Sequence, residues 1–198
     1  MISGIVLAAG TSSRMGSPKQ LLSYRGRPLL QHVIDRAGTA GLNELLVVLG
    51  HSAPEITEAI ELPGHARIVV NTSYESGHAS SLRLGLNSAS PKTRAAMIFL
   101  GDQPDLRTEV IVAVFSLYAE TGGPVVRAEY RGDPGHPVIL DRSIWGEISS
   151  SSGDRGAGPV LARHPEWVVP AAVDLPPPLE VDTPEDFQAL IAGDPETT

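Results

Sequence analysis

The chain has 198 residues, of which 41% are hydrophobic and only 5% aromatic, a size that suits one domain with a sizeable core. It has no cysteine, which excludes a disulfide framework, a thiolate nucleophile and a sulfur-ligated metal. The formal net charge of −8 disfavours nucleic acid as the main partner, because binding a polyanion normally requires a basic face.

The chain opens with an apolar run, Ile2 to Gly10, that has no basic region before it and is too short to span a bilayer. We interpret it as a buried strand. Together with the lack of cysteine, it favours a cytoplasmic protein with no membrane partner. The charged residues before Asp35 are all basic: Arg14, Lys19, Arg25 and Arg27. One end of this acidic protein therefore suits a small polyphosphate ligand.

Apolar runs rich in β-branched residues predict strands at Ile2 to Ala8, Leu45 to Leu49, Ile68 to Val70 and Met97 to Leu100. Helices are expected between them, and helix starts are predicted at Pro28, at a capping box in Ser52 to Glu55 and at another in Thr183 to Asp186. This alternation predicts a doubly wound α/β fold, with a mostly parallel sheet and helices on both faces. Ligands of such sheets bind beyond the carboxyl ends of the strands, so the chemistry is expected after Ala8, Val70 and Leu100.

The periodicity weakens after Thr121. Gly132 to Pro137 and the serine run Ser149 to Ser152 predict long loops, and Pro176 to Pro178 predicts an extended surface segment. No internal repeat or shift in composition marks a domain boundary. We therefore expect a single domain over residues 1–193, followed by a frayed tail at residues 194–198.

The strongest local pattern is the segment from Leu7 to Lys19, which directly follows the first predicted strand. Its small residues allow a base and ribose to lie against the backbone, and Gly10 and Gly16 permit the positive φ angles that turn amides toward an anion. Arg14 and Lys19 supply positive charge for phosphate oxygens. We therefore predict a nucleotide site formed by Leu7, Ala8, Ala9, Gly10, Arg14 and Lys19.

Two other glycine loops fit this segment poorly. A P-loop has four residues between its glycines and then Gly-Lys-Ser/Thr, whereas Lys19 does not follow a glycine here. A dinucleotide fingerprint needs Gly-x-Gly-x-x-Gly, which the segment lacks. A flexible surface connection would not explain why glycines and cations are combined directly after a buried strand.

The segment Leu7 to Lys19, continuing through Leu21-Leu22 and Gly26 to Leu30, resembles the signature of the molybdenum cofactor nucleotidyltransferase superfamily (MobA-like NTP transferases). Its Leu-Ala-Ala-Gly is similar to the cytidylyltransferase branch, whereas the guanylyl branch usually has a further glycine. Further segments share this likeness: Asn71 to Leu82, Gly101 to Pro104, Gly135 to Val138, Gly153 to Ala157 and Val181 to Asp186.

The resemblance implies a Rossmann-like nucleotidyltransferase fold and a reaction that depends on Mg²⁺. The implied reaction transfers CMP from CTP to the terminal phosphate of molybdopterin, the organic part of the molybdenum cofactor, and releases pyrophosphate. Arg14 and Lys19 would be its catalytic residues. A recipient molybdoenzyme or its chaperone would be a further partner.

Two aspartates are expected to bind the metal. Asp102 follows the strand Ala96 to Leu100, and Asp182 precedes the predicted helix cap at Thr183. An aspartate at a strand end is by itself more typical of a turn, but both match the metal-binding aspartates of the resembled family. Magnesium prefers a few carboxylates together with phosphates and water, which such a pair would provide.

A second set of residues is expected to contact nucleotide or acceptor. Ser80 and Ser81 lie where a helix is predicted to begin, so that their hydroxyls and free amides can bind ribose, phosphate or base. The resembled branch usually reads Gly-Met-Ser-Ser-Ser here, so His78 and Ala79 depart from it. His136, in a predicted loop, either contacts the acceptor or faces solvent.

Other functions remain open at this point, because a fold does not fix a substrate. GTP can replace CTP, and a sugar phosphate or polyol phosphate can replace molybdopterin as the acceptor. A third alternative is a noncatalytic carrier or chaperone for the cofactor. The combination of both aspartates with Lys19 disfavours the carrier.

Overall fold

The computed structural model describes residues 1–150 and 156–193, so the predicted tail at residues 194–198 lies outside the described residues. Its centre is a seven-stranded sheet in the order β5-β4-β1-β6-β8-β7-β9. The strands are β1 (Ile2–Ala8), β4 (Glu44–Leu49), β5 (Ala66–Val70), β6 (Ala95–Leu100), β7 (Val125–Tyr130), β8 (Asp133–Asp141) and β9 (Val168–Val173). β8 is antiparallel to both of its neighbours, and the other pairings are parallel.

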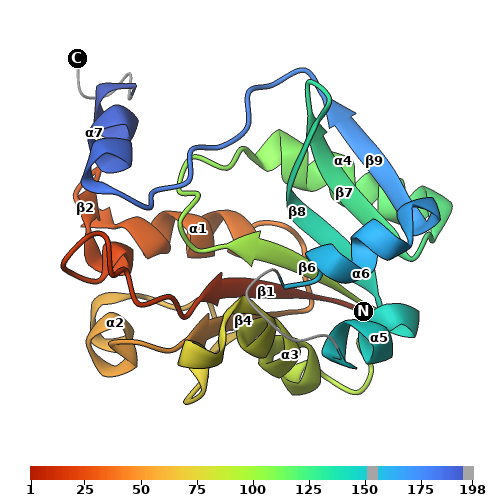
Figure 1. The fold of residues 1–198 in the computed structure, drawn as a ribbon, viewed down its shortest axis with the longest axis horizontal. Helices are drawn as coiled ribbons and strands as arrows, with labels where there is room; N and C mark the ends of the chain where they lie inside the picture. Colours follow the sequence, from red (N-terminus) through yellow and green to blue (C-terminus); the bar gives the residue numbers. More distant parts are fainter. Residues whose placement is uncertain (151–155, 194–198) are drawn as a thin grey trace.

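Helices cover both faces of the sheet (Figure 1). They are α1 (Leu29–Gly38), α2 (Ala53–Ala59), α3 (His78–Ser88), α4 (Thr108–Thr121), α5 (Trp145–Ser150), α6 (Gly158–Arg163) and α7 (Pro184–Ala192). The predicted doubly wound, mostly parallel α/β fold is therefore confirmed. No helix in the described ranges is long and apolar enough to cross a membrane.

Each face of the sheet has its own core, because alternate residues of a strand point to opposite sides. Val6 and Val47 pack on one face with residues of α1, α2 and α4. Ile5 and Val48 pack on the other face with residues of α3, α5 and α6. Since both faces are covered, the central strands are continuous apolar runs, which explains why they could be recognised in the sequence.

A third, smaller cluster fixes the end of the chain. Tyr24 of the short hairpin β2 (Ser23–Tyr24) and β3 (Arg27–Pro28) packs with Leu29, Val181 and Leu190. Leu190 belongs to α7, which lies beside β2 in Figure 1. This cluster anchors the segment before α7 next to the start of α1.

The structure corrects several local predictions. Gly132 to Pro137 is not a long loop. Gly132 belongs to the turn after β7, and Asp133 to Pro137 form the first part of β8, which pairs with β7. The serines Ser149 and Ser150 end α5, while the rest of that run lies outside the described residues. Ser52 has a left-handed backbone and makes no cap hydrogen bond through its side chain, so the predicted capping box before α2 is absent.

The capping box before α7 is confirmed. The Thr183 side chain accepts a hydrogen bond from the Asp186 amide, and the Asp186 carboxylate accepts one from the Thr183 amide. The helix α3 starts at His78, two residues before the predicted opening near Ser80. Its first residues follow Gly77, which has a positive φ of 95° that a residue with a side chain rarely adopts.

Candidate functional site

A cleft of about 950 Å³ lies at the carboxyl end of β1 and β6. Its lining includes Leu7 to Arg14 of the loop after β1, the segment around Asp102 after β6, and the first part of β8. β8 runs in the opposite direction to β6, so its beginning, not its end, lies at this edge of the sheet. The cleft therefore occupies the place where ligands of doubly wound sheets bind.

The loop can lie close to β6 because residue 101 is a glycine. A β-carbon at Gly101 would come within 2.7 Å of the Ala8 side chain and 3.0 Å of the Leu7 carbonyl oxygen. Any larger residue would push the loop away from the sheet. Gly101 therefore sets the distance between the loop after β1 and Asp102.

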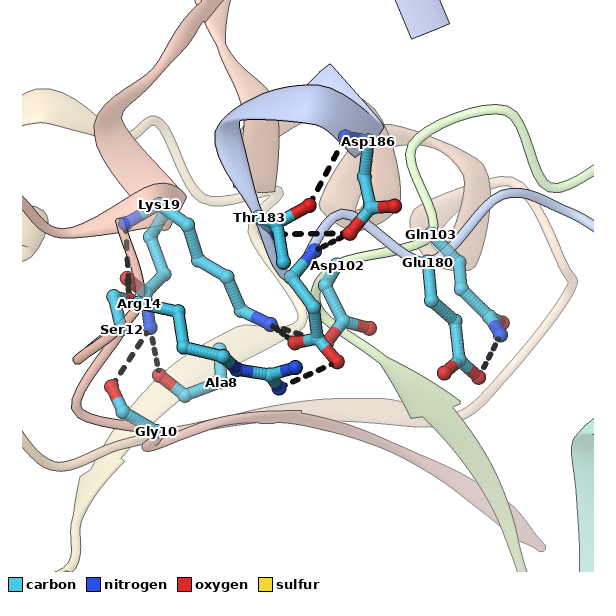
Figure 2. A network of polar contacts seen from close by, with 12 residues as sticks. Ala8, Gly10, Ser12, Arg14, Lys19, Asp102, Gln103, Glu180, Thr183 and Asp186 are labelled. Carbon is cyan, nitrogen blue, oxygen red and sulfur yellow. Dashed lines mark hydrogen bonds and ion pairs between the residues drawn. The ribbon is translucent and has the colours of Figure 1, made fainter. Parts of the chain in front are cut away.

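Lys19 joins the two predicted metal-binding aspartates. Its Nζ lies 2.6 Å from Asp102 Oδ2 and 2.7 Å from Asp182 Oδ1, and its side chain is largely buried. Figure 2 shows the Lys19 side chain pointing toward Asp102. Burial opposes the charged ammonium, but the charges and hydrogen bonds of the two carboxylates outweigh it and raise the pKa of Lys19. The lysine is therefore firmly protonated where the loop meets both acids.

Arg14 approaches Asp182 from the solvent side. Its guanidinium lies 2.9 Å from Asp182 Oδ2, and its side chain is 64% exposed. The hydrogen bond and charge of Lys19, assisted by Arg14, lower the pKa of Asp182. Both cations of the loop thus meet acids that come from distant parts of the sequence.

Asp182 is held in place by the backbone on both sides. The amide of Val181, next to it, donates to the Asp102 carbonyl oxygen at 3.0 Å. The amide of Asp182 itself donates to the Asp186 carboxylate at 3.1 Å, which links it to the capping box of α7. The two aspartates are therefore brought together by main-chain contacts as well as by Lys19.

The loop is braced by a buried glutamine. The Gln20 amide group donates to the carbonyl oxygens of Ala8 at 2.9 Å and Gly10 at 3.3 Å, and Ser12 donates to Gln20 Oε1 at 3.3 Å. The positive φ angles of the loop occur at Ser12 and Gly16. The predicted positive φ at Gly10 is wrong, because the turn uses Ser12, whose hydroxyl accepts a hydrogen bond from the Lys19 amide at 3.0 Å.

The carboxylates fit a divalent cation. Asp102 Oδ1 is buried and has no hydrogen-bond partner in the described part of the chain, so this oxygen is available to a ligand. No cluster of three or more acidic or histidine ligands occurs among the described residues. A metal held by Asp102 and Asp182 would therefore complete its coordination with phosphate and water, as Mg²⁺ commonly does.

The two predicted serines differ in position. Ser81 is buried and lines the cleft, and its hydroxyl accepts a hydrogen bond from Asn71 at 2.9 Å. Ser80 does not line the cleft, and its hydroxyl donates to the carbonyl oxygens of Ser73 and Gly77. Ser81 is therefore better placed than Ser80 to contact a ligand.

His136 lies in β8 and lines the cleft opposite the loop. Burial is the main cause that lowers its pKa to about 4; the charge of Asp102 opposes this shift, and the charge of Arg127 adds to it. The imidazole is therefore neutral near pH 7, so that it can donate or accept a hydrogen bond but does not add positive charge.

Some residues of the cleft were not predicted. Gln20 gives no signal in the sequence, because its role depends on the fold of the loop around it. Glu180 lines the cleft two residues before Asp182 and accepts a hydrogen bond from Gln103 at 3.0 Å. Burial and the neighbouring Asp102 raise its pKa. Arg127 also lines the cleft, and it follows two apolar residues at the start of β7. A charged residue in a mostly apolar strand is only a weak sign that one face of the strand borders a cleft.

This chain is similar to known proteins over most of its length. The model of the MobA-like NTP transferase domain matches residues 4–176. Nicotine blue oxidoreductase of Paenarthrobacter nicotinovorans is 32% identical over 201 residues, which cover 96% of each chain. A homologue of Rv0371c from Mycobacterium sp. strain JC1 is 31% identical with a TM-score of 0.86, covering 96% of this chain and 95% of that chain. Rv0371c of Mycobacterium tuberculosis, in a complex with manganese, is 32% identical with a TM-score of 0.82, covering 98% and 99%.

Proposed function

This chain belongs to the MobA-like NTP transferase domain family, and from that premise we propose that it transfers CMP from CTP to the terminal phosphate of molybdopterin. The observation that carries the proposal is the convergence of Asp102 and Asp182 on the ammonium group of Lys19. This arrangement combines paired carboxylates for a metal with fixed positive charge for phosphate. It lies beside a loop of small residues, at the edge of the sheet where a nucleotide is expected.

In the proposed reaction, an oxygen of the acceptor phosphate forms a bond to the α-phosphorus of CTP. The bond from that phosphorus to the bridging oxygen of the β-phosphate breaks, and pyrophosphate leaves. Lys19 and Arg14 stabilise the negative charge on the triphosphate. Asp102 and Asp182 would hold Mg²⁺, which neutralises the phosphates and aligns the reacting groups when it is bound.

Support for a divalent metal comes from two directions. Asp102 Oδ1 is buried without a partner among the described residues, and a mycobacterial relative has been crystallised with manganese. We propose Mg²⁺ as the physiological ion because carboxylate and phosphate oxygens are its preferred ligands. We also propose a cytoplasmic location, which the lack of cysteine favours.

Thermal unfolding with each nucleoside triphosphate and Mg²⁺ tests base preference, since a ligand that binds the native state raises its melting temperature. We expect CTP to raise it more than GTP does. A larger shift with GTP would replace the cytidylyl assignment by a guanylyl one. Pyrophosphate release with molybdopterin then tests the acceptor, and release only with a sugar phosphate or polyol phosphate would overturn the molybdopterin assignment.

An oxidoreductase is the second candidate, because a relative of that name aligns with 96% of this chain. The segment from Leu7 to Lys19 disfavours a dinucleotide, since it lacks the Gly-x-Gly-x-x-Gly spacing. Thermal unfolding with NADH and NADPH separates the candidates. A rise in melting temperature with a dinucleotide, but with no triphosphate, would favour the redox function. If CTP binds but no pyrophosphate is released, a carrier would be favoured.

A further inference from the structure

Arg127 is a cation of the cleft that the proposed chemistry does not use. It lies in the middle of β7, is half-buried and lines the cleft. Arg14 and Lys19, the cations on the loop side, form ion pairs with Asp182 and Asp102. Among the residues that the structure describes, no ion pair or hydrogen bond joins the Arg127 side chain to a partner. A partly desolvated cation without a partner is unfavourable, so this guanidinium is suited to an anion from outside the chain.

The position of Arg127 places it on the side of the cleft away from the loop. Arg127 pairs in register with Val138 of β8, and Val138 pairs with Ile98 of β6. Since neighbouring strands are spaced by about 4.8 Å, β7 lies roughly 10 Å to the side of β6. The acids of the nucleotide side follow β6 or precede α7, so they do not lie on this strand.

An apolar floor separates Arg127 from the loop side. Directly opposed residues on neighbouring strands share one face of a sheet, so Ile98, Val138 and Arg127 face the same side. Leu140 and Leu161 also line this part of the cleft. A ligand that crosses from the loop to Arg127 would therefore rest on aliphatic side chains and meet a positive charge at the far end.

Beside Arg127, His136 contributes no positive charge of its own, so the charge on this side of the cleft comes from the guanidinium of Arg127. The imidazole is kept neutral by burial and by the guanidinium itself, so it can contribute a hydrogen bond beside Arg127 without a second charge. Arginine is also well suited to phosphate, since its planar guanidinium can donate two parallel hydrogen bonds to one anion.

We infer that Arg127 forms an anion-binding subsite in the cleft, which takes an anionic group such as a phosphate ester attached to a body that is flat or apolar enough to lie over Ile98, Val138 and Leu140. The identity of this ligand as the acceptor rests on the proposed function, but the subsite itself does not. Arg127 holds this anionic group at the end of the cleft away from the triphosphate, beside His136, so an acceptor bound in this way presents its attacking phosphate at its other end, toward the loop.

Phenyl phosphate is a suitable probe because it joins a flat apolar body to one phosphate. Its dissociation constant is measured by titration calorimetry for the wild type and for Arg127→Gln, Arg127→Lys and Arg14→Gln. Arg131→Gln is the matched control, since Arg131 lies in the same hairpin but forms an exposed ion pair with Asp174. Far-UV circular dichroism checks the fold of each variant.

We expect Arg127→Gln to weaken phenyl phosphate binding by on the order of tenfold, because two charge-assisted hydrogen bonds are lost. Arg127→Lys should be intermediate and Arg131→Gln unchanged. Inorganic phosphate should bind more weakly than phenyl phosphate, since it does not contact the floor. Equal binding by the wild type and Arg127→Gln, or loss in Arg14→Gln alone, would overturn the subsite.

A parallel titration with CTP and Mg²⁺ separates this inference from the proposed function. If Arg127→Gln weakens phenyl phosphate binding while CTP binds to neither protein, the subsite stands and the nucleotidyltransferase proposal falls. If CTP binds equally to both proteins and phenyl phosphate does as well, the nucleotide site of the proposed function stands and the subsite falls.

Discussion

Lys19 contacts both acids of the cleft through a single ammonium group. Replacement by methionine keeps an unbranched side chain of nearly the same length but removes the charge, so the α-phosphate loses its stabilising partner and the two carboxylates repel each other. We expect turnover to fall on the order of 10²–10³-fold. Pyrophosphate release measures the effect, and circular dichroism shows whether the fold remains. The exposed Lys92, changed to methionine, is the control; an equal effect there would contradict a specific role for Lys19.

Asp102 is the residue that we expect to decide the metal response. Asp102→Asn keeps the size of the side chain but removes a charge and one carboxylate oxygen from the metal's coordination. The rise in melting temperature that Mg²⁺ or Mn²⁺ gives in the presence of CTP should be lost. Asp174→Asn, at a residue whose side chain is 94% exposed, should keep it. A wild-type metal response from Asp102→Asn would remove this residue from the metal site.

His136 makes stability depend on pH in a defined direction. Burial lowers its pKa from 6.5 to about 4, so between these values the unfolded chain binds more protons than the folded one. The stability that comes from the neutral imidazole is complete above pH 6.5 and is lost as the pH falls toward 4. Between pH 7 and pH 5 the wild type should lose about 2 kcal/mol from this residue.

Urea unfolding at pH 7 and pH 5 measures this loss. Since Asp102 and Arg127 also face the imidazole, the comparison must be made with His136→Gln, which keeps both neighbours. We expect the variant to lose about 2 kcal/mol less than the wild type between the two pH values. Equal losses in both proteins would show that His136 titrates normally in the folded state.

At the scale of elements, the start of α7 links stability to the site. Thr183 caps this helix, and its partner Asp186 also accepts the amide of Asp182. Thr183→Ala should lower the free energy of unfolding by about 1 kcal/mol, because a helix amide loses its partner. It should also reduce turnover by loosening Asp182. Thr183→Ser retains the hydroxyl and should restore both, so a defect in the serine variant would argue against the cap.

The first strands could be predicted and β8 could not, for physical reasons. β1, β4 and β6 are buried on both faces, so each gives an unbroken apolar run. The first part of β8 borders the cleft, and there Asp133 to Pro137 provide no apolar alternation. A register shift between Arg127 and Glu129 also breaks its pairing with β7. The composition of these residues is typical of a turn, and they form a strand only because they pair with β7.

At the scale of the whole molecule, the positions of the loop after β1 and of the two aspartates at one edge of the sheet could be predicted, because their patterns are local and similar to those of a known family. The spatial relations could not. Gln20 acts on carbonyl oxygens ten or more residues away, and Arg127 reaches the cleft through the order of β6, β8 and β7. The role of Gln20 depends on the fold of the loop around it, and that of Arg127 on the order of the strands, which a single sequence without strong strand signals does not fix.

The predicted single domain over residues 1–193 requires that both halves of the sheet unfold together. Trp145 and Trp167 both lie in the second half, near α5 and β9, and pack in the same core as Ile5 and Leu46 of the first half. Since this core extends across the sheet from β4 to β8, loss of packing on one side exposes the other.

Tryptophan fluorescence and far-UV circular dichroism should therefore give the same midpoint in a urea titration. Fluorescence reports on the second half, whereas circular dichroism reports on all helices and strands. CTP with Mg²⁺ should shift both curves equally, because Asp102 and Asp182 connect the nucleotide side to segments from both halves of the chain. The chain would unfold as two units rather than as one domain if the fluorescence midpoint came before the dichroism midpoint. The same would follow if CTP with Mg²⁺ left the fluorescence midpoint unchanged.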